Sequence, residues 1–201
     1  MVKKREPRHK VSRRFGVDIY GTGGDSLQRR LHIPPGGFKG GRRRRLSEYG
    51  MQLFEKQKAK AYYGVHERQF QRYYQQAERM PGNTGHNLLQ LIERRLDNVV
   101  YRLGFARTRP MARQLVVHGH VRVNGQKVDR PSYQVKPGEV ITLTEKALQI
   151  PVVIEEMESH RIVPAWLQRE GPVGRVVRLP ERDEIPEPIN EDLIIAFYSR
   201  Y

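Results

Sequence analysis

The stretch HGHVRVNGQKV, residues His118–Val128, decides how the middle of the chain folds. Asn124-Gly125 stands between two short runs that alternate apolar and polar residues, a pattern typical of a β-hairpin with a tight two-residue turn. Folding about this turn places Arg122 directly opposite Lys127 and leaves valines on the other face. Like charges directly opposite each other destabilise a strand pair. The sequence therefore predicts a basic hairpin, residues 118–128, whose cationic face binds an anion.

Helical patterns lead into the basic hairpin. Apolar residues recur at helical spacing over residues 86–103, which predicts one long helix. A second helix is expected over residues 110–118, because Pro110 stands at an early position where its missing N–H costs nothing. After the hairpin, residues 139–143 alternate as a strand does. Residues 86–145 therefore predict a compact α+β unit.

The rest of the chain is expected to be mainly helical, after a loose N-terminal arm. Residues 1–45 hold few apolar side chains and several glycine pairs, so they cannot bury enough surface to offset the entropy of ordering. Further elements are predicted as helices over 47–64, 66–80, 152–160 and 190–201 and a strand over 173–179.

The charge of the chain is strongly positive and uneven. Its 201 residues include 37 Lys and Arg against 22 Asp and Glu, for a net charge of +15 and a pI near 10.3. Residues 1–60 carry 17 basic and 5 acidic side chains, whereas residues 151–201 carry 6 and 10. A polyanion relieves such self-repulsion, which favours nucleic acid as the partner of the basic part. The acidic part, including Glu155, Glu156 and the Glu181–Glu187 cluster, faces either a basic neighbouring protein or solvent.

Missing residue types exclude some functions. The chain has no cysteine, which excludes disulfides, thiolate catalysis and cysteine-ligated zinc. The absence of cysteine is also compatible with the reducing cytoplasm, where we expect the protein. No apolar run approaches the roughly 18 residues of a membrane span.

At this point the sequence resembles a known family. Residues 95–139, RLDNVVYRLGFARTRPMARQLVVHGHVRVNGQKVDRPSYQVKPGE, closely resemble the RNA-binding domain named after bacterial ribosomal protein S4. The resemblance extends to PPGGFKGGRRRRLSEYGMQLFEKQKAKAYYGVHERQF upstream and INEDLIIAFYSR at the C-terminus, in the order of that family. It implies an α+β fold with a helical N-terminal region, an extended basic arm and an inserted S4-type domain of two helices on a small antiparallel sheet. The expected domains are the arm over 1–45, a mainly helical body over 46–85 plus 151–201, and the S4-type domain over 86–150.

The resemblance also implies a function. Proteins of this family are structural constituents of the small ribosomal subunit that bind its rRNA early and help nucleate assembly of the subunit body. They contribute to translational accuracy, contact ribosomal protein S5 and other small-subunit proteins, and line the path by which mRNA enters the ribosome. Some members also repress their own mRNA.

The expected RNA contacts are basic or polar side chains from both parts of the chain. The resemblance implies contacts from the helical portion at Arg42, Arg43, Arg44, Arg45, Lys56, Lys58, Lys60, Arg68, Gln69 and Arg72. The charge pattern adds contacts from the inserted domain at Arg107, Arg109, Arg113, Gln114, His118, His120, Arg122 and Lys127. A solvated charged face with nothing bound is the alternative, and the arginines that precede the hairpin make it the weaker one.

One departure from the family concerns zinc. Many bacterial relatives hold a zinc ion with four cysteines near the N-terminus, and this chain has none there. His9 and His32 alone cannot make a tetrahedral structural site. We expect no zinc and no other cofactor, with the arm held by rRNA instead.

An enzyme and a translational repressor are the two other classes of function to compare with this sequence. S4-type domains also occur fused to pseudouridine synthases, methyltransferases and a tRNA synthetase, but the remaining segments here are short and carry no nucleotide-binding loop. His118 and His120 share a face without a third ligand, and Glu93 and Asp97 are interpreted as part of a surface charge cluster. We expect no enzyme. A stand-alone translational repressor or an rRNA-modification accessory protein stays the alternative.

Overall fold

The computed structural model describes residues 6–37, 46–159 and 161–200. The predicted contacts Arg42–Arg45 lie outside these described residues. The chain divides into two compact units: unit 1 is Met1–His66 with Ile189–Tyr201, and unit 2 is Glu67–Pro188.

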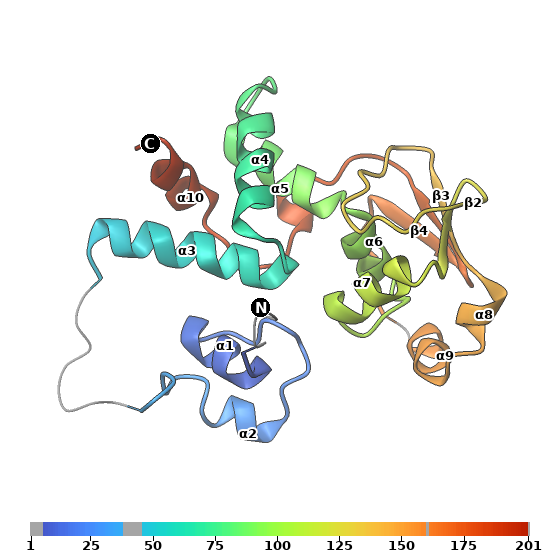
Figure 1. The fold of residues 1–201 in the computed structure, drawn as a ribbon, viewed down its shortest axis with the longest axis horizontal. Coiled ribbons are helices and arrows are strands. Elements are labelled where there is room, and N and C mark those ends of the chain that lie inside the picture. The colour runs from blue at the N-terminus through green and yellow to red at the C-terminus, as the bar shows by residue number, and fades with distance from the viewer. Residues whose placement is uncertain (1–5, 38–45, 160, 201) are drawn as a thin grey trace. The chain divides into compact units, whose positions relative to one another are not determined.

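Unit 1 is built around one long helix. Its elements are α1 (Arg8–Phe15), α2 (Asp25–Gln28), α3 (Glu48–Tyr63) and α10 (Glu191–Tyr198) (Figure 1). Ser47 caps α3 by accepting the Gly50 N–H at 3.1 Å. Helix α10 packs against α3, where Lys56 Nζ lies 4.0 Å from the ring centroid of Phe197. The C-terminal segment is therefore part of the same core as α3.

Residues 6–37 are folded, and the prediction of a loose, extended arm is wrong for them. The ring of Phe15 packs edge-on against Phe54 of α3, with 5.2 Å between centroids. The carboxylate of Asp18 accepts three backbone N–H groups of the loop that follows α1, at 2.8 to 3.2 Å. The buried apolar side chains of this segment are Val11, Phe15, Ile19 and Leu27. Because these side chains are few and irregularly spaced, hydrophobic periodicity did not predict the helices that carry them.

Unit 2 begins with helices and ends with a sheet. Its helices are α4 (Glu67–Glu78), α5 (Thr84–Glu93), α6 (Leu96–Arg102), α7 (Arg109–Val117), α8 (Glu145–Leu148) and α9 (Pro151–Glu158), with a 3-10 turn η1 (Arg182–Glu184). Its strands are β1 (Val121–Val123), β2 (Gln126–Lys127), β3 (Val140–Leu143), β4 (Leu167–Glu170) and β5 (Val173–Val176). No helix of the described residues is long and apolar enough to span a membrane.

The single helix predicted over residues 86–103 is two helices. The chain becomes extended at Arg95, with φ −64° and ψ 136°, and pairs there with Gln134. The Arg95 side chain is fully buried, binds both oxygens of Asp97 at 2.7 and 3.0 Å, and donates to the Tyr73 hydroxyl at 2.9 Å. The helical spacing of apolar residues continues through the break, so the pattern could not reveal it.

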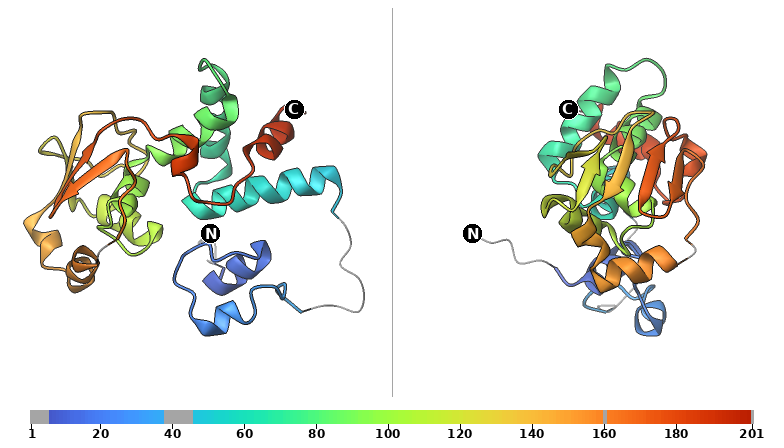
Figure 2. Two further views of the ribbon diagram at one scale, coloured as in Figure 1. Left: turned by 180° about the vertical axis from the view of Figure 1, so that it is seen from behind. Right: turned by 90° about the vertical axis from the view of Figure 1, so that its right-hand side faces the viewer.

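The five strands form one antiparallel sheet in the order β2-β1-β3-β5-β4. Its outer face is turned toward the viewer in the right-hand view of Figure 2. Strand β5 pairs with β3, so residues 167–176 share a sheet with the predicted 86–150 domain, whereas the sequence-based division assigned them to the helical body. Helix α4 also belongs to unit 2. The sequence-based division missed residues 167–176 because sheet pairing joins segments that are far apart in the sequence.

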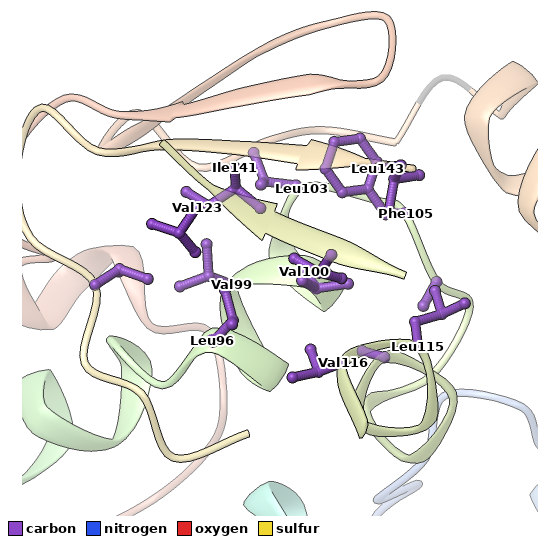
Figure 3. Packing of buried hydrophobic residues seen from close by; sticks show 14 of the residues in the cluster. Leu96, Val99, Val100, Leu103, Phe105, Leu115, Val116, Val123, Ile141 and Leu143 are labelled. Atoms are coloured by element: carbon purple, nitrogen blue, oxygen red, sulfur yellow. The ribbon is translucent and has the colours of Figure 1, made fainter. Parts of the chain in front are cut away.

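The core of unit 2 lies between the inner sheet face and helices α6 and α7 (Figure 3). Burial of each large apolar side chain contributes roughly 1.5 to 3 kcal/mol, so this layer dominates the stability of the unit. The labelled members are Leu96, Val99, Val100, Leu103, Phe105, Leu115, Val116, Val123, Ile141 and Leu143. The predicted α+β class, with helices on a small antiparallel sheet, is confirmed.

Candidate nucleic-acid interface

The basic hairpin adopts the predicted turn and register. Asn124 and Gly125 both have positive φ, 49° and 78°, as a tight two-residue hairpin turn requires. Arg122 pairs with Lys127 across the two strands. The turn is also fixed to β3, because the Asn124 backbone N–H donates to Val140 O at 2.8 Å and its Oδ1 accepts the Val140 N–H at 2.9 Å. The hairpin is therefore a rigid extension of the sheet.

The outer face of this hairpin is an unneutralised pair of cations. Arg122 and Lys127 are exposed, and neither has an acidic partner among the described residues. Arg122 donates to the carbonyl oxygen of Gly125 at 3.1 Å, which holds it close to the turn. The Lys127 side chain crosses Gly119, where a Cβ would overlap its Cε. Two fixed positive charges side by side attract phosphate, because an anion between them removes their repulsion.

The cationic face continues across the sheet to a residue that sequence reasoning missed. Arg122 pairs with Thr142 on β3, and Arg175 on β5 pairs with Val140 on the same strand. With neighbouring strands about 5 Å apart, this pairing places Arg175 on the outer face, two strands from Arg122. Arg175 is exposed and has no acidic partner within the described part of the chain. The alternation of side chains along residues 173–176 was the one sequence signal for the position of Arg175. It predicted a strand but not the strand with which β5 pairs.

The start of helix α7 and its end add further polar side chains. Arg107, just before α7, and Gln114 are exposed. Arg113 is half-buried. His118 is exposed, and its ring centroid lies 6.3 Å from that of His120. In the described segments no three His, Asp or Glu side chains form a group that could hold a metal.

Arg109 was predicted to contact RNA, but the structure places it in a buried ion pair. Its side chain is only 9% exposed, its Nε donates to Asn98 Oδ1 at 2.8 Å, and its guanidinium pairs with Glu187. Glu187 also binds Arg102 at 2.5 Å, and Arg102 in turn binds Glu93 at 2.7 Å. Arg109 thus ties α7 to a segment 78 residues later in the chain, and an RNA contact through it is not supported.

This network also corrects the interpretation of Glu93 and Asp97 as a surface charge cluster. Glu93 is fully buried and Asp97 is 4% exposed, each held by an arginine. Burial by itself raises the pKa of Glu187, but Arg109 and Arg102 outweigh it and hold that pKa at about 2. Glu187 therefore stays charged at neutral pH, and the network serves the fold.

The lysines of α3 are largely engaged inside unit 1. Lys56 is 5% exposed and lies over an aromatic ring, and Lys58 binds Glu55 at 2.6 Å. Lys60 is half-buried and donates to Gln57 at 3.3 Å. An RNA contact through Lys56 or Lys58 is therefore not supported by their placement.

The polar side chains of α4 are more accessible. Arg68 and Arg72 are exposed and have no acidic partner in the ranges described. Gln69 is half-buried and donates to the Tyr73 hydroxyl at 3.4 Å, so its amide is partly engaged. Arg68 and Arg72 are therefore accessible to phosphate.

Comparisons with known proteins agree with this picture. Residues 3–93 match the family described as ribosomal protein S4/S9 N-terminal domain, and residues 94–141 match the S4 domain. Relatives named small ribosomal subunit protein uS4 come from Geobacillus sp. strain WCH70 and Thermoanaerobacter sp. strain X514, both 52% identical, and from Rubrobacter xylanophilus, 50% identical. Each of these comparisons covers 96% of this chain and 97% of the relative. The S4-domain match ends within β3, so Arg175 lies beyond it.

Proposed function

We propose a role on the ribosome from the premise that this chain belongs to the family of small ribosomal subunit protein uS4. It is a structural constituent of the small subunit and binds small-subunit rRNA, on ribosomes of the cytoplasm. Because the family is one of ribosomal structural proteins, the chain is not an enzyme.

One observation carries the RNA-binding part of this proposal. Arg122 and Lys127 are held side by side on a rigid hairpin, without an acidic partner among the described residues. Such a pair costs stability unless an anion occupies it, and a folded RNA supplies phosphates at close spacing. Arginine can additionally stack on unpaired bases.

A salt series tests the proposal directly. The purified chain is titrated with small-subunit rRNA and with an unrelated folded RNA of equal length. We expect a preference for the rRNA that survives high salt, together with a steep log–log dependence of affinity on salt. Equal affinities that fall together as salt rises would show generic charge attraction and contradict specific rRNA binding.

The finer roles implied by the resemblance are proposed as well. They are early rRNA binding that nucleates assembly of the subunit body, a contribution to translational accuracy, contact with S5 and neighbouring small-subunit proteins, contact with mRNA where it enters the ribosome, and repression of the protein's own mRNA.

The acidic side chains of α9 support a basic protein neighbour. Glu155 and Glu156 have no cationic partner in the described structure, whereas Glu184 and Glu187 are already paired inside unit 2. Reversing the charge of Glu155 and Glu156 is expected to weaken a protein contact and leave rRNA affinity equal or higher. Loss of rRNA binding in that variant would contradict the assignment.

We also propose that the N-terminal region functions without zinc. The residues present do not fit that metal, since cysteines are absent and His9 and His32 are the only histidines before residue 66. Instead, Arg13 donates to the carbonyls of Ile33 and Pro34 at 2.8 and 2.9 Å, and Asp18 organises the loop after α1. A zinc-selective chelator, with the Mg²⁺ concentration held constant, should leave the unfolding temperature and the rRNA affinity unchanged.

A further inference from the structure

A pocket of about 340 Å³ opens on unit 2, away from the strands of the basic hairpin. Its size is at the lower end of the range, roughly 300 to 1,000 Å³, in which small ligands bind. It lies where the end of α6 meets the segments after α9 and after η1. Its lining residues are Tyr101, Arg102, Arg161, Ile162, Pro164, Glu184 and Pro186.

Tyr101 carries two guanidinium groups against its ring. The Arg109 and Arg161 guanidinium carbons each lie 4.5 Å from the ring centroid. The charge of Arg109 is balanced by Glu187. Arg161 has no acidic partner among the residues described, so it is the positive charge of this pocket that nothing in unit 2 neutralises.

Arg161 is nevertheless held in place. One of its N–H groups donates to the Ala106 carbonyl at 3.1 Å and another to the Tyr101 hydroxyl at 3.3 Å. Its remaining N–H groups have no acceptor in the described structure and are available to a ligand. Arg107, the neighbour of Ala106, is exposed and likewise lacks an acidic partner among these residues. The fixed cation inside the pocket makes a site for an anionic group.

The remaining wall of the pocket is apolar. Ile162 is 92% exposed, which is unusual for so large an aliphatic side chain, and Pro164 and Pro186 also line the pocket. The one carboxylate of the wall, Glu184, binds Arg178 through both oxygens at 2.7 and 2.8 Å, and its pKa stays lowered despite partial burial. The pocket therefore combines an apolar wall with one available positive charge.

We propose that this pocket receives one unpaired nucleotide of the RNA that the basic hairpin binds. Arg161 takes its phosphate through the N–H groups that have no acceptor in the described structure, and its base lies against Ile162 and the prolines. Unpaired bases splayed onto planar side chains are the usual basis of sequence-specific RNA recognition. RNA fits better than an acidic peptide because it supplies a planar apolar group and a phosphate within a single residue. This inference rests on the proposed rRNA binding and adds a site for a single unpaired nucleotide to it.

The test uses the full chain and small-subunit rRNA, with two pocket variants and two matched controls. Arg161→Ala removes the free cation, and Ile162→Ser removes the apolar wall without changing charge. Arg130→Ala removes an exposed cation elsewhere in unit 2, and Val152→Ser shortens an aliphatic side chain of α9 that is 43% exposed. Affinity is measured across a salt series, and the accessibility of each rRNA base is mapped by chemical probing. Unfolding midpoints verify that all four variants fold.

Both pocket variants are expected to lower rRNA affinity about five-fold or more, the smallest loss expected when one stacked base is released. Both should also expose the same single rRNA base to the probe. Arg161→Ala alone should lower the salt slope, by about 0.7 to 0.9. The control variants should change affinity less than about two-fold and expose no base.

Three other outcomes would contradict either the proposed rRNA binding or the nucleotide pocket. If the unmodified chain shows no preference for rRNA, the proposed function itself fails. If it prefers rRNA and hairpin variants weaken binding, but the pocket variants keep full affinity and base protection, the nucleotide pocket is wrong and the function stands. If the pocket variants bind rRNA normally but fail to recruit another small-subunit protein during reconstitution, the occupant is a protein, which also contradicts the inference.

Discussion

Arg109 and Glu187 form a buried ion pair although 78 residues separate them in the chain. The pair joins the start of α7 to the segment that follows η1, and Arg102 extends it to Glu93 at the end of α5. An arginine that the charge pattern assigned to the RNA surface is therefore a structural residue. The cationic surface consists instead of side chains that no carboxylate reaches, among them Arg122 and Lys127.

Replacing Glu187 with Gln should destabilise unit 2 by about 3 kcal/mol, because it leaves two buried guanidinium groups without their shared carboxylate. Trp166, the only tryptophan, is fully buried in this unit, so its fluorescence in a urea titration measures the change. Glu155→Gln is the matched control, because its side chain is exposed and has no cationic partner in the described structure. Equal stability of the two variants would contradict a structural role for the network.

The contribution of Glu187 should depend on pH in a defined direction. Its pKa is held at about 2 in the folded protein, below its ordinary value of 4.5, by Arg109 and Arg102 acting against the effect of burial. A carboxyl whose folded pKa is lowered stabilises the protein above its unfolded pKa and loses that effect as pH falls toward its folded pKa. The difference in unfolding free energy between the unmodified chain and Glu187→Gln should therefore be constant from pH 7 to about pH 5 and shrink between about pH 4.5 and pH 2. If this difference in unfolding free energy grew as the pH fell, the pKa of Glu187 would be raised by folding and not lowered.

Replacing both Arg122 and Lys127 with Ala should separate function from stability. RNA affinity should fall, and the salt slope should decrease by about 1.5, since up to two phosphate contacts disappear. The unfolding free energy should stay equal or rise by about 0.2 to 1 kcal/mol, because a pair of like charges across two strands is removed. Lys146→Ala, an exposed lysine on α8, is the control for loss of charge alone. A double variant that loses stability and affinity together would indicate that the hairpin had unfolded.

Asn124→Ala should weaken the hairpin without changing any charge. The substitution places alanine at φ 49°, a left-handed region that costs most L-residues about 1 to 2 kcal/mol but that asparagine tolerates because its side chain can hydrogen-bond locally. It also removes the hydrogen bond to the Val140 N–H. We expect a stability loss of about 1 to 3 kcal/mol in thermal unfolding and a smaller loss of rRNA affinity. Gln126→Ala, at an exposed position of β2, should be close to neutral. Unchanged stability of Asn124→Ala would show that the turn does not fix the hairpin.

Much of the fold could be predicted from short stretches of sequence. Asn124-Gly125 predicted both the turn and the register, because few residues tolerate positive φ at two successive positions. Ser47 and Pro110 marked helix starts, since caps and proline act within a single turn of helix. The family could be predicted from residues 95–139 and the two flanking motifs, which occur in the order typical of that family. The comparisons confirm the family over 96% of the chain.

Long-range contacts decided the remainder. The break at Arg95 depends on Tyr73 and Gln134, and the burial of Arg109 depends on Glu187, none of which is a neighbour in sequence. Strand β5 joins β3 across about thirty intervening residues and carries Arg175 onto the outer sheet face. Local sequence determined turns, caps and the excess of positive charge, because those depend on backbone preference and composition. Which cations are free to meet RNA was set by tertiary structure, because a charge is neutralised only by whatever folding brings within a few ångströms of it.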